Sequence, residues 1–226
     1  MSGPAKEPAQ ARAAMVADQL RARGIADERI LEAMGAIPRE AFVPDYARAE
    51  AYADEALPIE AGQTISQPLM VAKMTELLEV RPGDRILEIG TGSGYQAAVL
   101  AWLGAEVTSL ERQATLIPSA RARLDALAPA IELAGSVDIR EGDGSLGDPA
   151  GAPWDGIIVT AAAPAVPGAL REQLRDGANL VIPVGPRDRQ VLTVVTRTGD
   201  RWNDRTEGYC VFVPLIGSGG FDDDWA

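Results

Sequence analysis

Residues 87 to 95, which read LEIGTGSGY, carry the pattern in this chain that most directly suggests chemistry. The three glycines are Gly90, Gly92 and Gly94. A glycine loop between a strand and a helix lets a ligand approach the backbone closely and presents N–H groups at the helix start. A dinucleotide site would need a small residue at position 95, where Tyr95 stands. Because Glu88 also precedes the first glycine by two residues, the pattern favours a nucleoside ligand with a charged amino-acid tail.

Polar side chains follow at the ends of the next predicted strands. Glu111 ends the run EVTSLE, the position from which a carboxylate accepts hydrogen bonds from both ribose hydroxyls. Asp143, in EGDGS, ends the third strand, where a carboxylate can accept from the amino group of adenine. Thr160, in VTAAAP, follows the fourth strand, beside the switch point of an open α/β sheet. These residues predict an adenosyl ligand, and S-adenosylmethionine (SAM) fits better than NAD or ATP.

The stretch QTISQP, residues 63 to 68, offers the hydroxyl of Ser66 just before an apolar segment with helical spacing. The chain contains no histidine, so a serine nucleophile activated by imidazole is excluded. On local sequence alone, Ser66 is predicted to be the N-cap of the following helix, with Pro68 in its first turn.

The composition argues against several other functions. The net charge of −12 disfavours nucleic-acid binding and docking on anionic lipid. Cys210 is the only cysteine, so no intrachain disulfide can form and a reducing compartment is expected. No apolar run reaches the ~18 residues of a membrane span, and the N-terminus lacks the apolar region of a signal peptide. We expect a cytoplasmic protein without a metal site.

The elements that must position these residues follow two patterns. The first few residues are expected to be disordered; a helical pattern then ends at Gly24, restarts with Asp27 as its N-cap and stops at Gly35. Beyond residue 80, strands and helices alternate, which predicts a doubly wound, mostly parallel Rossmann-like sheet with antiparallel strands at its C-terminal end. We expect one integrated domain, made of a helical segment over 1–80, an α/β core over 81–216 and an acidic tail over 217–226.

The chain resembles the protein-L-isoaspartate O-methyltransferases over nearly its whole length, from DQLRARGI to FVPLIG. The resemblance rests on ordered blocks that include IPREAFVP, GQTISQP, ILEIGTGSGYQAAVLA, EGDG, DGIIVTAAAP and LVIPVG. The glycine loop alone indicates a methyltransferase, and GQTISQP narrows it to this family. The resemblance implies a bacterial-type enzyme that methylates the α-carboxylate of L-isoaspartyl residues in damaged proteins. Its products would be S-adenosylhomocysteine (SAH) and an ester that cyclises to a succinimide, which initiates repair.

The resemblance also implies which residues form the site. Ser66 matches the family's active-site serine, which implies that its hydroxyl donates a hydrogen bond that orients the acceptor carboxylate, a role compatible with an N-cap. That carboxylate is already ionised at neutral pH, so methyl transfer to it needs no base. Leu69 stands where many relatives have an aromatic residue or a histidine. The expected cofactor-binding residues are Thr64, Ile65, Glu88, Gly90, Thr91, Gly92, Glu111, Gly142, Asp143 and Thr160. The expected partners are isoaspartyl peptides and proteins, held through exposed backbone near VTAAAP and FVPL. We expect a monomer that binds neither nucleic acid nor membrane.

Two alternatives stay open at this point. A related carboxyl methyltransferase that modifies aspartate in a dedicated ribosomal peptide would share the chemistry, although the chain has little sequence beyond residue 216 for extra substrate contacts. A SAM-sensing protein on the same fold would be non-enzymatic, and the intact GQTISQP block argues against it. Methyl transfer to an isoaspartyl peptide, compared with its aspartyl twin, separates the possibilities.

Overall fold

The computed structural model describes residues 7–127 and 130–222. The predicted disorder at the start of the chain lies almost wholly outside the described residues, as does the acidic end of the predicted tail. The first described helix, α1 (Pro8–Ala14), already begins at Pro8, a residue that suits the first turn because it has no N–H to satisfy. No helix within the described ranges has the length and apolar character needed to cross a membrane.

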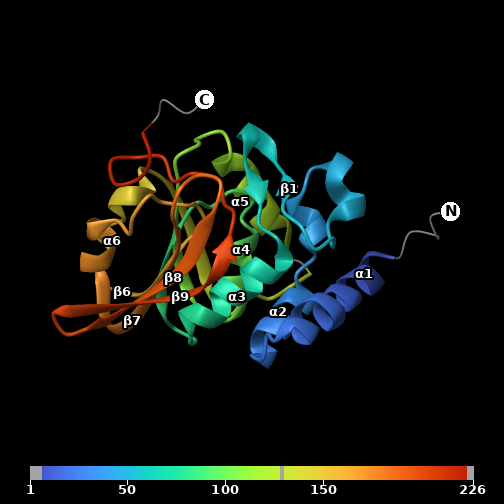
Figure 1. Cartoon of the computed structure of the whole chain (residues 1–226). Helices are drawn as coiled ribbons and strands as arrows, with labels where there is room; N and C mark the ends of the chain where they lie inside the picture. Colours follow the sequence, from blue (N-terminus) through green and yellow to red (C-terminus); the bar gives the residue numbers. More distant parts are fainter. Residues whose placement is uncertain (1–6, 128–129, 223–226) are drawn as a thin grey trace.

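A seven-stranded sheet in the order β5-β4-β3-β6-β7-β8-β9 forms the centre of the molecule (Figure 1). Its strands are β3 (Arg85–Ile89), β4 (Glu106–Glu111), β5 (Ser136–Glu141), β6 (Trp154–Val159), β7 (Leu174–Val184), β8 (Gln190–Thr198) and β9 (Arg201–Cys210). Neighbours from β5 to β7 pair in parallel, and β8 and β9 pair antiparallel. This confirms the predicted fold. Because β3 lies between β4 and β6, the loops that follow these strands are neighbours at one edge of the sheet.

Successive side chains of the strands alternate between the two faces of the sheet, as the twofold period of a strand requires. Ile86 belongs to a hydrophobic cluster with α3 (Pro68–Leu78) and α4 (Tyr95–Trp102). The next residue, Leu87, belongs to a cluster with α6 (Gly168–Glu172) on the opposite face. Helix α5 (Ile117–Leu127) packs beside β5. Burial on both faces explains why the parallel strands read as nearly continuous apolar runs.

The segment before the sheet is built from short helices and one small hairpin. Its remaining elements are η1 (Met15–Leu20), η2 (Arg21–Arg23), α2 (Glu28–Ala36), η3 (Arg39–Phe42), η4 (Asp45–Glu50), β1 (Leu57–Pro58), η5 (Glu60–Gly62) and β2 (Thr64–Ile65). Gly24 ends the first helical stretch at φ +97°, as predicted. The predicted stop at Gly35 is wrong, because α2 continues to Ala36. The next residue, Ile37, is extended, as expected of a residue that precedes a proline, and so stops the helix.

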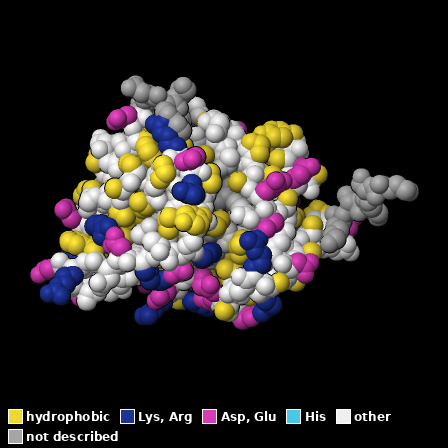
Figure 2. Space-filling view, in the orientation of Figure 1, with side chains coloured by type: hydrophobic (Ala, Val, Ile, Leu, Met, Phe, Trp, Pro, Cys, Tyr) yellow, Lys and Arg dark blue, Asp and Glu magenta, His cyan; other side chains and the backbone are white. Residues whose placement is uncertain are grey.

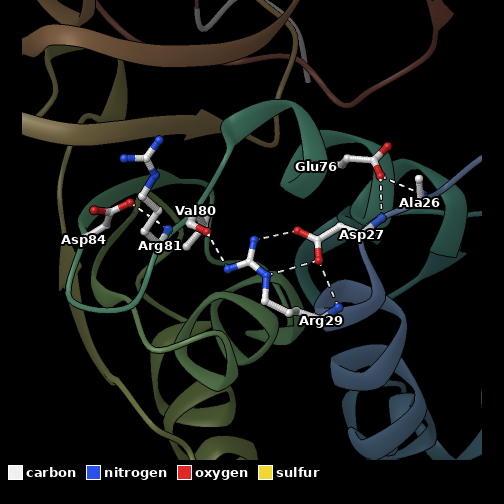
Figure 3. Close-up of polar contacts among 7 residues, drawn as sticks. All are labelled: Ala26, Asp27, Arg29, Glu76, Val80, Arg81 and Asp84. Atoms are coloured by element: carbon white, nitrogen blue, oxygen red, sulfur yellow. Dashed lines mark hydrogen bonds and ion pairs between the residues drawn. The ribbon is translucent and has the colours of Figure 1, made fainter.

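Helix α2 is fixed to α3 by polar contacts as well as by the shared core (Figure 3). The Asp27 carboxylate accepts a hydrogen bond from the N–H of Arg29, which confirms Asp27 as the N-cap. A carboxylate oxygen of Glu76, on α3, accepts from the N–H groups of Ala26 at 2.8 Å and Asp27 at 3.0 Å. Arg29 also donates to the carbonyl oxygen of Val80 at 3.1 Å. Because α3 starts two residues after Ser66, these contacts help to hold the loop that carries this hydroxyl.

Figure 2 shows acidic and basic side chains interspersed over one face, with hydrophobic side chains gathered over the C-terminal end of β9. Tyr209 and Val211 are exposed there, at 75% and 70% of their surface. The chain runs from this patch into Val213 and Pro214, which pair with the segment after β6. The hydrophobic patch therefore lies beside a stretch that reaches the carboxyl edge of the sheet.

Candidate active site

The glycine loop joins β3 to α4 in a backbone conformation that suits glycine. Gly90, Gly92 and Gly94 have φ values of +93°, +52° and +89°. The hydroxyl of Thr160, just after β6, donates to the carbonyl oxygens of Ile89 at 3.0 Å and Gly90 at 2.7 Å. A Cβ on Gly90 would lie 2.5 Å from this hydroxyl oxygen. The loop is therefore held against the end of β6 at a distance that only glycine permits.

A Gly90→Ala variant is expected to lose about 2–4 kcal/mol of stability. Alanine is strained in the left-handed backbone conformation of this position, and its Cβ would clash with Thr160. Gly92→Ala is the matched control, since its Cβ would meet nothing closer than 3.7 Å and would cost about 1 kcal/mol. Denaturant unfolding of both variants measures the difference. Equal losses would contradict the tight approach, and Thr160→Ala should recover part of the loss in Gly90→Ala.

Glu111 ends β4 with its carboxylate turned back to the glycine loop. One carboxylate oxygen accepts from the N–H of Gly92 at 2.9 Å, and the other accepts from the N–H of Gln113 at 2.8 Å. The side chain is 6% exposed. Each oxygen keeps a further lone pair, so the carboxylate can take two more hydrogen bonds. Glu111 therefore links the glycine loop to the loop after β4 and offers a fixed acceptor between them.

Glu88 lies underneath the glycine loop and is fully buried. Its carboxyl accepts a short hydrogen bond from the hydroxyl of Ser109, whose oxygen lies 2.5 Å from the hydroxyl of Thr91. The second carboxyl oxygen, Oε1, has no partner among the described residues. Burial raises the pKa of Glu88 to about 8, against a smaller lowering by Ser109. At neutral pH this carboxyl is therefore mostly protonated, and it supports the loop from below.

Asp143 and Gly142 occupy the end of β5. The Asp143 carboxylate accepts from the N–H and hydroxyl of Ser145 and, at 2.8 Å, from the N–H of Ser218. Burial alone would raise the pKa of Asp143, but the hydrogen bonds from Ser145 and Ser218 outweigh it and lower this pKa. Gly142 donates its N–H to the carbonyl oxygen of Glu111. Asp143 thus fastens residues 217–219, part of the predicted acidic tail, to the sheet edge, so this stretch is ordered structure.

Two adjoining cavities open at this edge of the sheet. The large cavity is open to solvent and comprises about 650 Å³ of space between its walls, part of it bulk solvent. Its wall is formed by Gln63, Thr64, Ile89, Gly90, Gly92, Leu110, Glu111, Arg112, Gln113, Gly144, Thr160, Ala161, Val213, Pro214, Leu215 and Ile216. The small cavity, of about 290 Å³, is lined by Thr64, Ile65, Ser66, Val71, Gly90, Thr91, Gly92, Ser93, Tyr95, Gln96 and Thr160. Four residues line both cavities: Thr64, Gly90, Gly92 and Thr160.

Ser66 lies in the small cavity and is half-buried. The predicted N-cap role is wrong, because Gln67 occupies the cap and no side chain caps the helix. Pro68 takes the first helical position, and it has no N–H that a serine could satisfy. Within the described part of the chain, nothing accepts a hydrogen bond from the Ser66 hydroxyl, so this donor is available to a ligand.

The structure brings together most of the residues that the sequence singled out. Eight of them line a cavity: Thr64, Ile65, Ser66, Gly90, Thr91, Gly92, Glu111 and Thr160. The other three, Glu88, Gly142 and Asp143, support the walls of the large cavity. Sequence reasoning missed Gln113 and the wall formed by residues 213–216. The FVPL block had marked the second of these, but only as a candidate peptide contact.

The expectation of free backbone near VTAAAP and FVPL is wrong for its central residues. Ala162 donates to the carbonyl oxygen of Val213 at 2.8 Å and accepts from the N–H of Leu215 at 2.7 Å. Ala163 is paired in the same way with Pro183 and Gly185. The two segments pair with each other because both run along the carboxyl edge of the sheet. They close the large cavity instead of offering an edge to a peptide.

The donor set fits an adenosyl ligand with an amino-acid tail. Ile89, Leu110 and Leu215 supply apolar wall for a flat base, and Glu111 is placed to accept from sugar hydroxyls. Within the described residues, the N–H groups of Gly90, Gly92 and Gly94 already have protein acceptors, whereas those of Thr91 and Ser93 remain for an anionic tail. A mostly parallel Rossmann-like sheet with this loop and this carboxylate defines the class of SAM-dependent methyltransferases.

Comparison with known proteins identifies the family. Residues 11–220 match the family model described as protein-L-isoaspartate(D-aspartate) O-methyltransferase (PCMT). A protein-L-isoaspartate O-methyltransferase of Methylorubrum populi is 55% identical over 207 residues, which cover 91% of this chain and 95% of that relative. The chain therefore belongs to the PCMT family, which confirms the resemblance found in its sequence.

Solved structures show the same fold. A protein-L-isoaspartate O-methyltransferase superposes with a TM-score of 0.81 at 29% identity, covering 92% of this chain and 67% of the other. A second structure, from Plasmodium falciparum, gives a TM-score of 0.77 at 24% identity over 91% of this chain and 98% of the other. That structure is described as a PCMT in complex with S-adenosyl-L-homocysteine.

Proposed function

We propose that this chain transfers the methyl group of SAM to the α-carboxylate of L-isoaspartyl residues in damaged proteins and peptides. The ester formed would close to a succinimide and so start repair. The observation that carries the proposal is the junction of the two cavities at Thr64, Gly90, Gly92 and Thr160. A donor in the large cavity and a carboxylate beside Ser66 would meet at this junction.

In the large cavity, Glu111 would hold the ribose, and the glycine loop would hold the amino-acid tail. SAM supplies an activated methyl group on a sulfonium. Two hydrogen bonds from Thr160, to Ile89 and Gly90, hold the loop between the cavities, so the wall against which the donor would lie is fixed. Positioning of this kind replaces the encounter of two molecules by a step within one complex and can supply a large part of the rate.

In the small cavity, Ser66 would donate one hydrogen bond to a carboxylate oxygen and turn the other oxygen to the methyl group. The carboxylate needs no general base, because its ordinary pKa lies near 4. A neutral donor also suits a reaction in which opposite charges disappear. A cationic donor in direct contact would bind the carboxylate more tightly than the transition state and would slow the step.

The Ser66→Ala variant is expected to lower turnover on an isoaspartyl peptide by about 10- to 100-fold, the equivalent of a hydrogen bond to a charged group. SAM affinity and thermal stability should stay unchanged, since Ser66 neither caps α3 nor lines the large cavity. Ser66→Thr keeps the hydroxyl and serves as the control. Unchanged turnover in Ser66→Ala would remove the serine from the mechanism.

The experiment that tests the function as a whole is methyl transfer from SAM to an isoaspartyl peptide and to its aspartyl twin. Transfer to the isoaspartyl peptide alone supports a repair enzyme. Transfer to the aspartyl peptide would favour the enzyme that tailors a dedicated peptide, and no transfer would favour a SAM-binding protein. Tyr209 and Val211 are exposed just before the wall residues Val213 and Pro214 in the chain, and such a hydrophobic surface would suit side chains that flank the damaged residue.

We also infer that the protein acts as a cytoplasmic monomer and does not bind nucleic acid. The described residues of one chain line both cavities, which supports a site that is complete in a single copy. The net charge of −12 would repel a phosphate backbone. Light scattering of the purified protein and a filter-binding assay with DNA and RNA test the two statements.

A further inference from the structure

Arg39 is a buried cation that the mechanism above does not use. It opens the short helix η3, and its side chain is 0% exposed. Its Nε donates to the carbonyl oxygen of Ala51 at 2.7 Å, whereas Nη1 and Nη2 have no hydrogen-bond partner among the described residues. The neighbouring acid, Glu40, is turned towards Arg12 and Tyr52. Within the described ranges, Arg39 therefore has no carboxylate partner.

The groups that face Arg39 leave its charge uncompensated. Burial lowers the pKa of Arg39 to about 10, against small opposing effects of Tyr95 and Tyr52, so the guanidinium stays protonated at neutral pH. Burial raises the pKa of Tyr95 to about 12, and burial raises that of Tyr52 as well, so both phenols are neutral. The hydroxyl of Tyr95 is itself buried without a partner among the described residues. The Arg39 guanidinium therefore carries a full positive charge in surroundings of low polarity.

Tyr95 connects this charge to the small cavity. The guanidinium carbon of Arg39 lies 5.2 Å from the centre of the Tyr95 ring, a cation–π distance. Phe42 packs edge-on against the same ring, with 5.3 Å between centroids, and holds it in place. Tyr95 is the first residue of α4 and is among the residues that line the small cavity with Ser66. One aromatic residue thus lies between the buried cation and the place proposed for the substrate carboxylate.

We propose that Arg39 is a positioning residue whose fixed charge, one side chain behind the small cavity, draws the substrate carboxylate into place beside Ser66. The inference rests on the proposed function. A charge at this distance attracts the carboxylate without forming the tight pair that would oppose the reaction. The same charge repels the sulfonium of SAM, so its removal should change the two affinities in opposite directions. A merely structural role would weaken both.

The test compares Arg39→Met, which removes the charge and keeps the bulk, with Arg39→Lys, which keeps the charge. Exchange of a buried ion for an apolar side chain is often neutral for folding, so the Met variant is expected to fold. Arg48→Met is the control for net charge, because Arg48 is exposed and paired with Asp45. KM for an isoaspartyl peptide is measured by methyl transfer, and Kd values for SAM and SAH are measured by calorimetry without turnover.

In Arg39→Met, we expect KM for the peptide to rise about tenfold, the size expected for attraction between the guanidinium and the carboxylate in a medium of intermediate polarity. The rise should persist in high salt, because salt screens a buried charge only weakly. The SAM affinity relative to SAH should increase, and Arg39→Lys should keep most of the wild-type KM. An unchanged KM in Arg39→Met overturns the proposal, as does a joint loss of peptide and SAM affinity that lysine does not rescue. If the wild-type protein transfers no methyl group to the peptide, the proposed function is wrong, whatever the Arg39 variants show.

Discussion

Replacement of Glu111 by alanine is expected to weaken SAM binding by about 100-fold or more. The carboxylate would accept hydrogen bonds from two ribose hydroxyls, and each such bond to a charged group contributes roughly 1.5–3 kcal/mol. The same side chain holds the N–H groups of Gly92 and Gln113, so the empty site should also become less ordered. Calorimetric titration with SAM measures the affinity, and thermal unfolding of the unliganded protein measures the second effect.

Glu106 supplies a matched control for this experiment. It begins the same strand, β4, and its side chain is exposed, so Glu106→Ala makes the same change of charge without touching the cavity. An SAH analogue that lacks the ribose 2′-hydroxyl gives a second control. It should bind the Glu111→Ala variant almost as well as SAH does, while it binds the wild-type protein more weakly. Wild-type affinity for SAM in Glu111→Ala would exclude the ribose contact.

The second large effect concerns stability and pH, through Glu88. Because its folded-state pKa of about 8 lies above the ordinary 4.5, the folded protein binds this proton more tightly than the unfolded chain does. The stabilisation is fully present below pH 4.5 and is lost as the pH rises to about 8. The folded-state pKa lies roughly 3 to 4 above the ordinary value, and at about 1.36 kcal/mol for each pH unit the loss amounts to as much as ~5 kcal/mol.

Glu88→Gln cannot ionise, so its stability should stay nearly constant over the range in which the wild-type protein weakens. We expect the variant to be less sensitive to alkaline pH and to exceed the wild-type stability near pH 9. Urea unfolding of the unliganded proteins at pH 5, 7 and 9 measures this, with Glu106→Gln as the control for an exposed acid on a neighbouring strand. Parallel pH profiles for the wild-type protein and Glu88→Gln would show that Glu88 is not the group responsible.

The fold could be predicted from the sequence because its signals are local and repeated. Alternation of apolar strands with helices requires crossover connections, and the missing crossover before the last strands requires antiparallel pairing. Asp27 and Gly24 could be read in the same way, because a cap depends on its immediate neighbours. The prediction that α2 stops at Gly35 failed because the proline two residues after Ala36 determines the end of the helix more strongly than a glycine does.

The site was predictable in its residues but not in their roles. Spacing before the glycine loop identified Glu88, and position at the end of a strand identified Glu111, yet only the packing of Ser109 and Thr91 shows that Glu88 faces inward. The N-cap assigned to Ser66 failed by one residue, since the cap depends on the backbone angle at Gln67. Burial of an arginine depends on contacts with distant residues, so nothing in the block IPREAFVP distinguishes Arg39 from a surface residue.

The walls of the large cavity come from loops spread between Gln63 and Ile216. No single stretch of chain holds enough of these walls to bind a ligand, so binding competence appears only when the whole sheet is in register. Ligand binding should therefore stabilise the molecule as one cooperative unit, by about 2.7 kcal/mol at a concentration 100 times Kd. A destabilising substitution in a remote strand such as β7 should then reduce the fraction of molecules able to bind, and added SAM should rescue it.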